Sequence, residues 1–128
     1  MTYSGKNHFT EKEQACPHCG LIALADGFLD EMNLLREAAG HALNVTSMCR
    51  CPTHNSRVGG ALSSYHLTDR PWKCCAADIS VSGWDGAKRW RFMKIAMSHG
   101  FSVALAKTFV HVDLRAKYTK MEPVAYAY

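Results

Sequence analysis

Residues 109–115 alternate between apolar and polar side chains, a period that a β-strand uses to present two different faces. The apolar positions are Val110, Val112 and Leu114, and the polar positions are His111, Asp113 and Arg115. Residues 76–81 repeat the pattern, with Asp78 and Ser80 on one face and Ala77, Ile79 and Val81 on the other. We therefore predict two strands whose apolar faces enter the core and whose polar faces are exposed.

Two histidines and a carboxylate occur in the order expected of a catalytic zinc site, namely His66, Asp78 and His111. A zinc ion at a hydrolytic centre takes three nitrogen or oxygen ligands and keeps a fourth position open for water. A surface strand needs polar residues, but it does not need His, Asp and Arg at successive polar positions. The pattern therefore favours a chemical role for this face.

At these residues the chain resembles the M15 family of zinc metallopeptidases, which includes zinc D-Ala-D-Ala carboxypeptidases and phage endolysins. The family signature S-x-H-x-x-G-x-A-x-D is matched by Ser64, His66, Ala76 and Asp78. The later F-[IV]-H-x-D-x-R signature is matched by Phe109, Val110, His111, Asp113 and Arg115. Residues 50–61 also resemble the segment that precedes the first signature, so that the resemblance covers roughly residues 43–115.

The resemblance implies a single α+β domain in which helices flank a small antiparallel sheet, the hedgehog/DD-peptidase-like fold, with the metal on the sheet face. It implies a zinc peptidase that hydrolyses peptidoglycan peptide bonds through a zinc-activated water, with peptidoglycan stem peptides as its substrate. His66, Asp78 and His111 would be the zinc ligands. Arg50 and Ser64 match positions that contact substrate in the family, and an arginine suits a terminal carboxylate.

A general base must take a proton from the attacking water. Many family members carry an acidic residue three positions before the last histidine, but here that position is Thr108, which cannot serve. Asp113 is the nearest acidic alternative on the same strand face as His111, and it is our candidate catalytic residue. The other role open to Asp113 is to orient His111 or Arg115.

The chain departs from the family signature between His66 and Asp78, which are twelve positions apart where the family has seven. The extra residues fall within 69–75, where Pro71 and Trp72 indicate a loop. We predict that this loop borders the cleft, with Trp72 as a substrate contact. Two alternatives are an anchoring role for the loop through Cys74 or Cys75, and a disrupted site in an inactive relative.

Four of the six cysteines form a C-x-x-C and a C-x-C pair, which are Cys16, Cys19, Cys49 and Cys51. These thiolates are candidates for a second, structural zinc site, and His18 is a candidate substitute ligand. A disulfide and free thiols are the alternatives, because the redox state depends on the compartment.

Length and composition bound the remaining possibilities. With 128 residues, 48% hydrophobic and 20% charged, the chain fits one globular domain, with residues 1–13 as a polar lead-in and 121–128 unassigned. No apolar run approaches the roughly 20 residues of a membrane span, and no signal-peptide pattern occurs at the N-terminus. We expect a monomer held in the cytoplasm of a bacterial host until its release to the cell wall. The net charge of +4 is not clustered, so we expect no nucleic-acid partner.

The predicted elements are helices over residues 26–39, capped by Asp26, and 86–99, together with strands over 43–48, 76–81, 101–106 and 109–115. Two other functions stay open as alternatives. One is a non-catalytic cell-wall-binding or structural module with the same fold. The other is a zinc-ribbon nucleic-acid protein built on the cysteines, which leaves His66, Asp78 and His111 unexplained.

Overall fold

The computed structural model describes residues 4–128, so the first three residues of the predicted lead-in lie outside the described residues. The described chain builds one five-stranded sheet with the spatial order β1-β2-β4-β3-β5. The strands are β1 (Val45–Ser47), β2 (Ala76–Ser80), β3 (Ser102–Leu105), β4 (Phe109–Asp113) and β5 (Ala125–Ala127). Together with the helices around it, this sheet confirms the predicted α+β class.

The centre of the sheet pairs β2 with β4 in antiparallel register, so that Asp78 lies opposite His111 and Ala76 lies opposite Asp113. β1 pairs antiparallel with β2, and β3 pairs antiparallel with β4. The last strand differs, because β5 adds to the sheet edge parallel to β3. The sheet that was predicted as antiparallel is therefore mixed at this edge, where the unassigned tail returns to form a strand.

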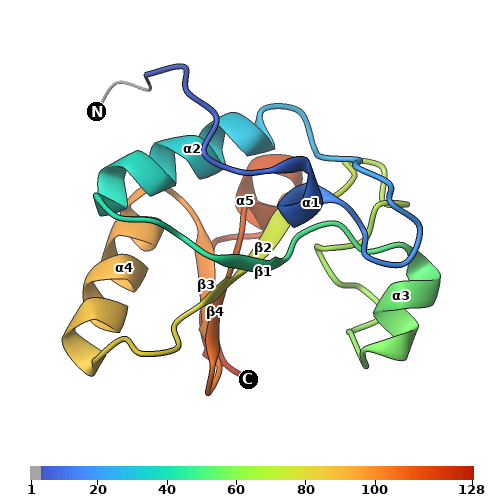
Figure 1. Cartoon of the computed structure of the whole chain (residues 1–128). Helices are drawn as coiled ribbons and strands as arrows, with labels where there is room; N and C mark the ends of the chain where they lie inside the picture. Colours follow the sequence, from blue (N-terminus) through green and yellow to red (C-terminus); the bar gives the residue numbers. More distant parts are fainter. Residues whose placement is uncertain (1–3) are drawn as a thin grey trace.

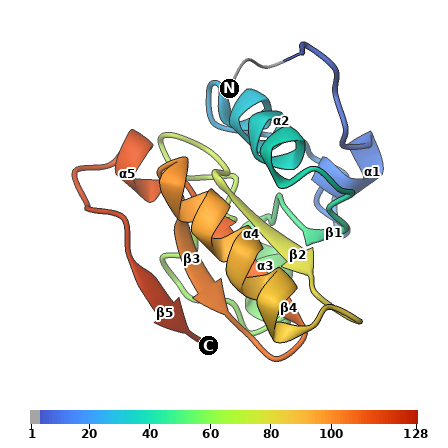
Figure 2. The ribbon, with the colours of Figure 1, turned by 90° about the vertical axis from the view of Figure 1, so that its left-hand side faces the viewer.

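The helices are α1 (Glu11–Gln14), α2 (Phe28–Ala39), α3 (Pro52–Arg57), α4 (Gly86–Ser98) and α5 (Arg115–Tyr118). α4 lies on one side of the sheet and α3 on the other (Figure 1), and α4 covers its side of the sheet (Figure 2). The predicted cap at Asp26 is wrong, because α2 follows a left-handed Gly27 and has no side-chain cap. Within residues 4–128, no helix combines the length and the hydropathy needed to cross a bilayer.

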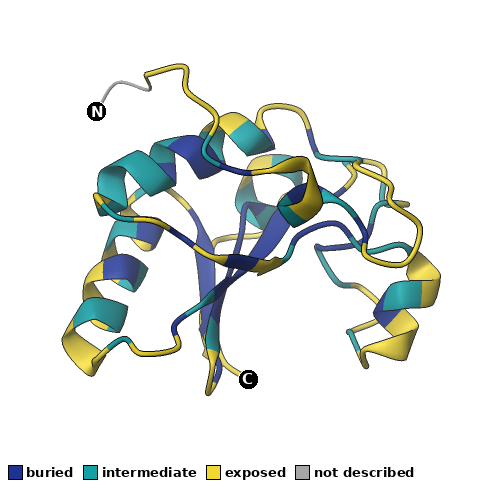
Figure 3. Cartoon of the chain, viewed as in Figure 1, coloured by how far each residue is buried: buried dark blue, intermediate teal, exposed yellow. Residues whose placement is uncertain are grey.

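The core forms between the sheet and the helices on the α4 side, as the dark blue segments of Figure 3 show. The apolar sides of β2 and β4 enter it as the alternation predicted, with Ile79, Val110 and Val112 fully buried. The polar side was expected to be exposed, but Asp113 is 0% exposed and His111 only 3%. Each polar atom of this buried face therefore needs a hydrogen-bond partner.

Both ends of the described chain contribute to the domain. Thr10 and Glu13 form a capping box at α1, and Phe9 beside them is buried. At the other end, Val103 donates its N–H to the Val124 carbonyl, and Tyr128 donates its N–H to the Leu105 carbonyl. These hydrogen bonds hold β5 against β3 and place its side chains beside the polar face of β4.

Candidate metal centre

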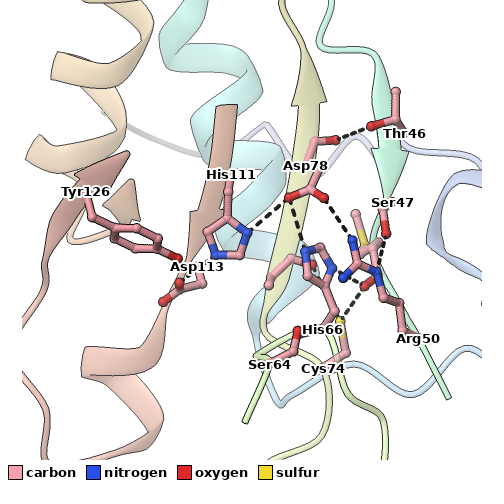
Figure 4. Close-up of polar contacts among 12 residues, drawn as sticks. Thr46, Ser47, Arg50, Ser64, His66, Cys74, Asp78, His111, Asp113 and Tyr126 are labelled. Carbon is pink, nitrogen blue, oxygen red and sulfur yellow. Dashed lines mark hydrogen bonds and ion pairs between the residues drawn. The ribbon is translucent and has the colours of Figure 1, made fainter. Parts of the chain in front are cut away.

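Three side chains from separate segments converge on the polar face of the sheet. Asp78 comes from β2, His111 from β4, and His66 from the loop that follows α3. His66 Nε2 lies 3.1 Å and His111 Nδ1 lies 3.0 Å from the same oxygen, Asp78 Oδ1. Their ligand atoms all lie within 4.8 Å of one another (Figure 4). The structure thus brings together the three residues that the sequence singled out.

The hydrogen-bond partner of the outer nitrogen fixes the tautomer of each imidazole ring. His66 Nδ1 lies 2.7 Å from the Met48 carbonyl oxygen, which can only accept, so Nδ1 carries the proton. His111 Nε2 lies 2.8 Å from Asp113 Oδ2 and donates in the same way. In the neutral form of each ring, the inner nitrogen then presents a lone pair to Asp78. Three acceptors converge, and a cation between them satisfies all three.

Without a metal ion, the charges of the three groups compensate one another. Burial lowers the pKa of His66 and favours its neutral form. Burial works to raise the pKa of Asp78, but hydrogen bonds with His111 and His66 hold it well below its usual range. For His111, burial works to lower the pKa, while hydrogen bonds with Asp113 and Asp78 raise it. Two imidazole nitrogens and one carboxylate oxygen are a ligand set that zinc accepts with an open fourth position.

Asp113 lies behind His111 as seen from Asp78. Its Oδ2 accepts from His111 Nε2 and, at 2.9 Å, from Arg115 Nη2. Its Oδ1 accepts from the Arg115 backbone N–H at 2.9 Å and from Arg115 Nε at 3.0 Å. The carboxylate has no exposed surface. These contacts match the orienting role that the sequence left open, since both oxygens already hold donors and neither faces the cleft.

A cleft of about 660 Å³ opens beside the three ligands. Arg50 and Ser64, the predicted substrate contacts, both line it. Arg50 Nη2 lies 3.1 Å from Asp78 Oδ2, and its Nε donates to Ser47 Oγ at 3.0 Å. Ser64 Oγ accepts from the His66 backbone N–H at 3.2 Å and so also supports the ligand loop. Among the described residues that line the cleft, Asp78 is the only carboxylate.

The insertion leaves the three ligands in place. Cys74 exchanges backbone hydrogen bonds with residues 23 and 25, which anchors the end of the inserted loop to the segment before α2. Trp72 does not line the cleft. It packs against the core and stacks on Tyr65 at 6.3 Å between ring centroids, with the Arg70 guanidinium 4.9 Å above it. Trp72 can therefore reach a substrate only through Tyr65, which does line the cleft.

Sequence reasoning missed the aromatic wall of the cleft, formed by Tyr65, Tyr126 and Tyr128. The His111 ring lies 6.4 Å from the Tyr126 ring and 6.0 Å from the Tyr128 ring. The Arg115 guanidinium lies 4.5 Å from the Tyr65 ring centroid and donates to the Tyr126 hydroxyl at 3.4 Å. The alternation of alanine and tyrosine over residues 125–128 was the available indication of a strand with one aromatic face.

A second cluster forms away from the sheet. The sulfur atoms of Cys16, Cys19 and Cys51 lie within 4.8 Å of one another. Cys49, predicted as the fourth member, is not among them, because it is fully buried beside Cys74. The chain turns into α3 at Cys51, so residues 49 and 51 no longer share a face as they would in a strand.

Comparison with known proteins gives one family match. The family model described as Peptidase M15 matches residues 7–113, most of the chain. No curated protein matches the chain. The matched stretch contains His66, Asp78 and His111, and it ends before the segment that forms α5 and β5.

Proposed function

This chain belongs to the peptidase M15 family, and on that premise we propose that it is a zinc-dependent peptidase acting on the stem peptides of peptidoglycan. The observation that supports the zinc assignment is the convergence of two imidazole nitrogens on the Asp78 carboxylate. Hydrogen bonds from His66 Nδ1 to the Met48 carbonyl and from His111 Nε2 to Asp113 orient both imidazoles, and such bonds raise the basicity of a metal-binding histidine.

His66, Asp78 and His111 would hold the zinc ion. When bound, zinc supplies a water activated as a nucleophile near neutral pH and polarises the scissile carbonyl. Asp113 would keep the His111 ring in its tautomer, with Nε2 protonated and Nδ1 free to bind. We infer that Asp113 acts by orienting His111. The alternative is that Asp113 is the general base, and Asp113→Asn distinguishes the two roles.

The chemistry of the cleft favours a peptide that carries a carboxylate. Arg50 and Arg115 both line it, and a guanidinium pairs with a carboxylate through two parallel hydrogen bonds. Arg50 Nη2 is 3.1 Å from Asp78 Oδ2, so the positive charge of Arg50 lies beside the metal ligands. A terminal carboxylate of the substrate that bound Arg50 would therefore bring the scissile bond close to the metal. Tyr126 and Tyr128 offer apolar faces to the remainder of the peptide.

A digest of purified peptidoglycan, analysed by mass spectrometry, tests this function. The zinc-loaded protein should release stem-peptide fragments whose ends identify the bond cleaved. His111→Ala should lose both the active-site zinc and the cleavage, because two ligands hold zinc far more weakly than three. His99→Ala, at the C-terminal end of α4, is the matched control and should keep both.

Two outcomes would contradict the proposal. Zinc-loaded protein that binds peptidoglycan without cleaving it would indicate a non-catalytic binding module with this fold. Full zinc occupancy of this site in His111→Ala would show that the ligand assignment is wrong.

A further inference from the structure

The cysteine cluster has the dimensions of a tetrahedral metal site. Thiolates that lie 2.3 Å from a tetrahedral zinc are about 3.8 Å from one another. The sulfur atoms of Cys16, Cys19 and Cys51 all lie within 4.8 Å of each other. Cys16 and Cys19 flank a tight turn that Gly20 closes, donating its N–H to the Cys16 carbonyl at 2.8 Å with φ 77°. The turn therefore directs two sulfurs toward the third.

His18, inside the same turn, offers the fourth ligand. Its Nδ1 lies 3.4 Å from Cys51 Sγ. An imidazole nitrogen and a thiolate bound to one tetrahedral zinc are about 3.5 Å apart, given bond lengths of about 2.0 and 2.3 Å. The histidine thus lies at the correct distance from Cys51. It is not within 4.8 Å of all three sulfurs, so a rotation of its side chain has to complete the site.

Backbone N–H groups already point at the sulfurs. The Cys51 N–H donates to Cys16 Sγ at 3.3 Å, and the His54 N–H donates to Cys51 Sγ at 3.4 Å. Such donors favour the negatively charged thiolate over the thiol. The thiolate is the form that binds a metal.

A disulfide accounts for less of this arrangement than a metal does. One disulfide joins two sulfurs and leaves the third cysteine and the histidine without a role. A three-cysteine, one-histidine set is one of the usual ligand sets of structural zinc. It also needs no sulfur from Cys49, which is buried elsewhere.

We propose that Cys16, His18, Cys19 and Cys51 bind a structural zinc ion that fastens the segment after α1 to the start of α3. Figure 1 shows that segment running beside the start of α3, far along the chain from it. Arg50 precedes the ligand Cys51 and reaches Asp78 with its side chain. The second metal therefore holds one wall of the cleft as well as the N-terminal segment.

Metal content and cobalt spectroscopy of the intact protein, purified under reducing conditions, test the proposal independently of activity. The protein should hold two zinc ions per chain, and Cys19→Ser should hold one. Cys19 is exposed, so the substitution leaves the core untouched. The cobalt-substituted protein should show a near-ultraviolet thiolate-to-cobalt charge-transfer band, since only the cysteine site supplies sulfur. That band should vanish in Cys19→Ser and persist in His111→Ala.

A pair of histidine variants tests the fourth ligand. His18→Ala should weaken binding of the second zinc roughly tenfold or more, because a structural zinc needs four protein ligands to close its site. His54→Ala, a histidine on the neighbouring helix α3, should leave it unchanged. One zinc per chain, removed by His111→Ala alone, would overturn the proposal, and so would a cobalt derivative without the thiolate band. Equal effects of the two histidine variants would overturn the assignment of His18.

Discussion

Replacing Asp113 by asparagine should weaken zinc binding more than it lowers the turnover of the zinc-loaded protein. The Asp113 carboxylate accepts four hydrogen bonds, from His111 Nε2 and from three N–H groups of Arg115. Asparagine keeps one carbonyl oxygen and replaces the other by an NH₂ group, which donates. In either orientation, the NH₂ group then faces at least one donor that has lost its acceptor.

The magnitude follows from these contacts. Removing a partner that orients a metal-bound histidine reduces metal affinity about 10–100-fold, which is about 1.4–2.7 kcal/mol. Removing one charge from a buried ion pair also lowers the free energy of unfolding by about 3–5 kcal/mol. The Arg115 side chain is mostly buried, so water can replace little of the lost interaction with Asp113. The loss is smaller than the stability of many domains, so we expect a folded variant.

Zinc affinity is measured by competition with a chelator, and turnover is measured separately at saturating zinc. If Asp113 acts through His111, affinity falls while turnover at full occupancy changes by less than the loss in affinity. Asp85→Asn is the matched control, because the Asp85 carboxylate caps α4 at the surface by accepting the Lys88 N–H. An unchanged zinc affinity together with a roughly 100-fold loss of turnover would refute this reasoning and make Asp113 the general base.

Three further predictions concern stability. Gly60→Ala should lower the free energy of unfolding by about 1–3 kcal/mol, because the new Cβ would lie 2.0 Å from Asn55 Oδ1. Gly86→Ala is the control and should not lower it, because a Cβ there meets open space; urea unfolding of both variants measures the difference. Trp72→Ala should lower the melting temperature while KM changes little, since the indole packs on the core outside the cleft. In metal-free protein, Asp78 has a pKa below its unfolded value, so its stabilisation is present above pH ~4 and lost on acidification. Thermal unfolding across about pH 1–5 should show a shallower acid limb in Asp78→Asn.

The sequence predicted the parts of the fold that depend on local periodicity. The alternation around Ile79 and Val112 identified β2 and β4, and the same period placed Asp78 and His111 on one face. β5 was missed because its residues are exposed and the alternation that indicates it covers only residues 125–128, so that its pairing with β3 could not be foreseen. Cys49 was assigned to the wrong cluster for a similar reason. A spacing of two shares a face only while the chain stays extended, and the chain turns into α3 at Cys51.

The burial of the polar face could not be predicted from the sequence alone. Alternation divides a strand into two faces, but it does not say what lies over each of them. Arg115 and the tyrosines of the C-terminal segment cover the polar side of β4, and these tyrosines come from outside the stretch that matches the family. The positioning contacts of Asp113 depend on that cover.

The pairing of Asp78 with His111 across β2 and β4 makes metal binding a late event in folding. The two ligands are 33 residues apart in the chain, and they meet only when two central strands have found their register. A slip of one residue would turn Asp78 to the apolar side and leave an alanine or isoleucine opposite His111. Long-range pairing of this kind is slow compared with helix formation. In a stopped-flow experiment, the cobalt d–d spectrum of this centre should therefore appear in the last kinetic phase, after helical circular dichroism has recovered.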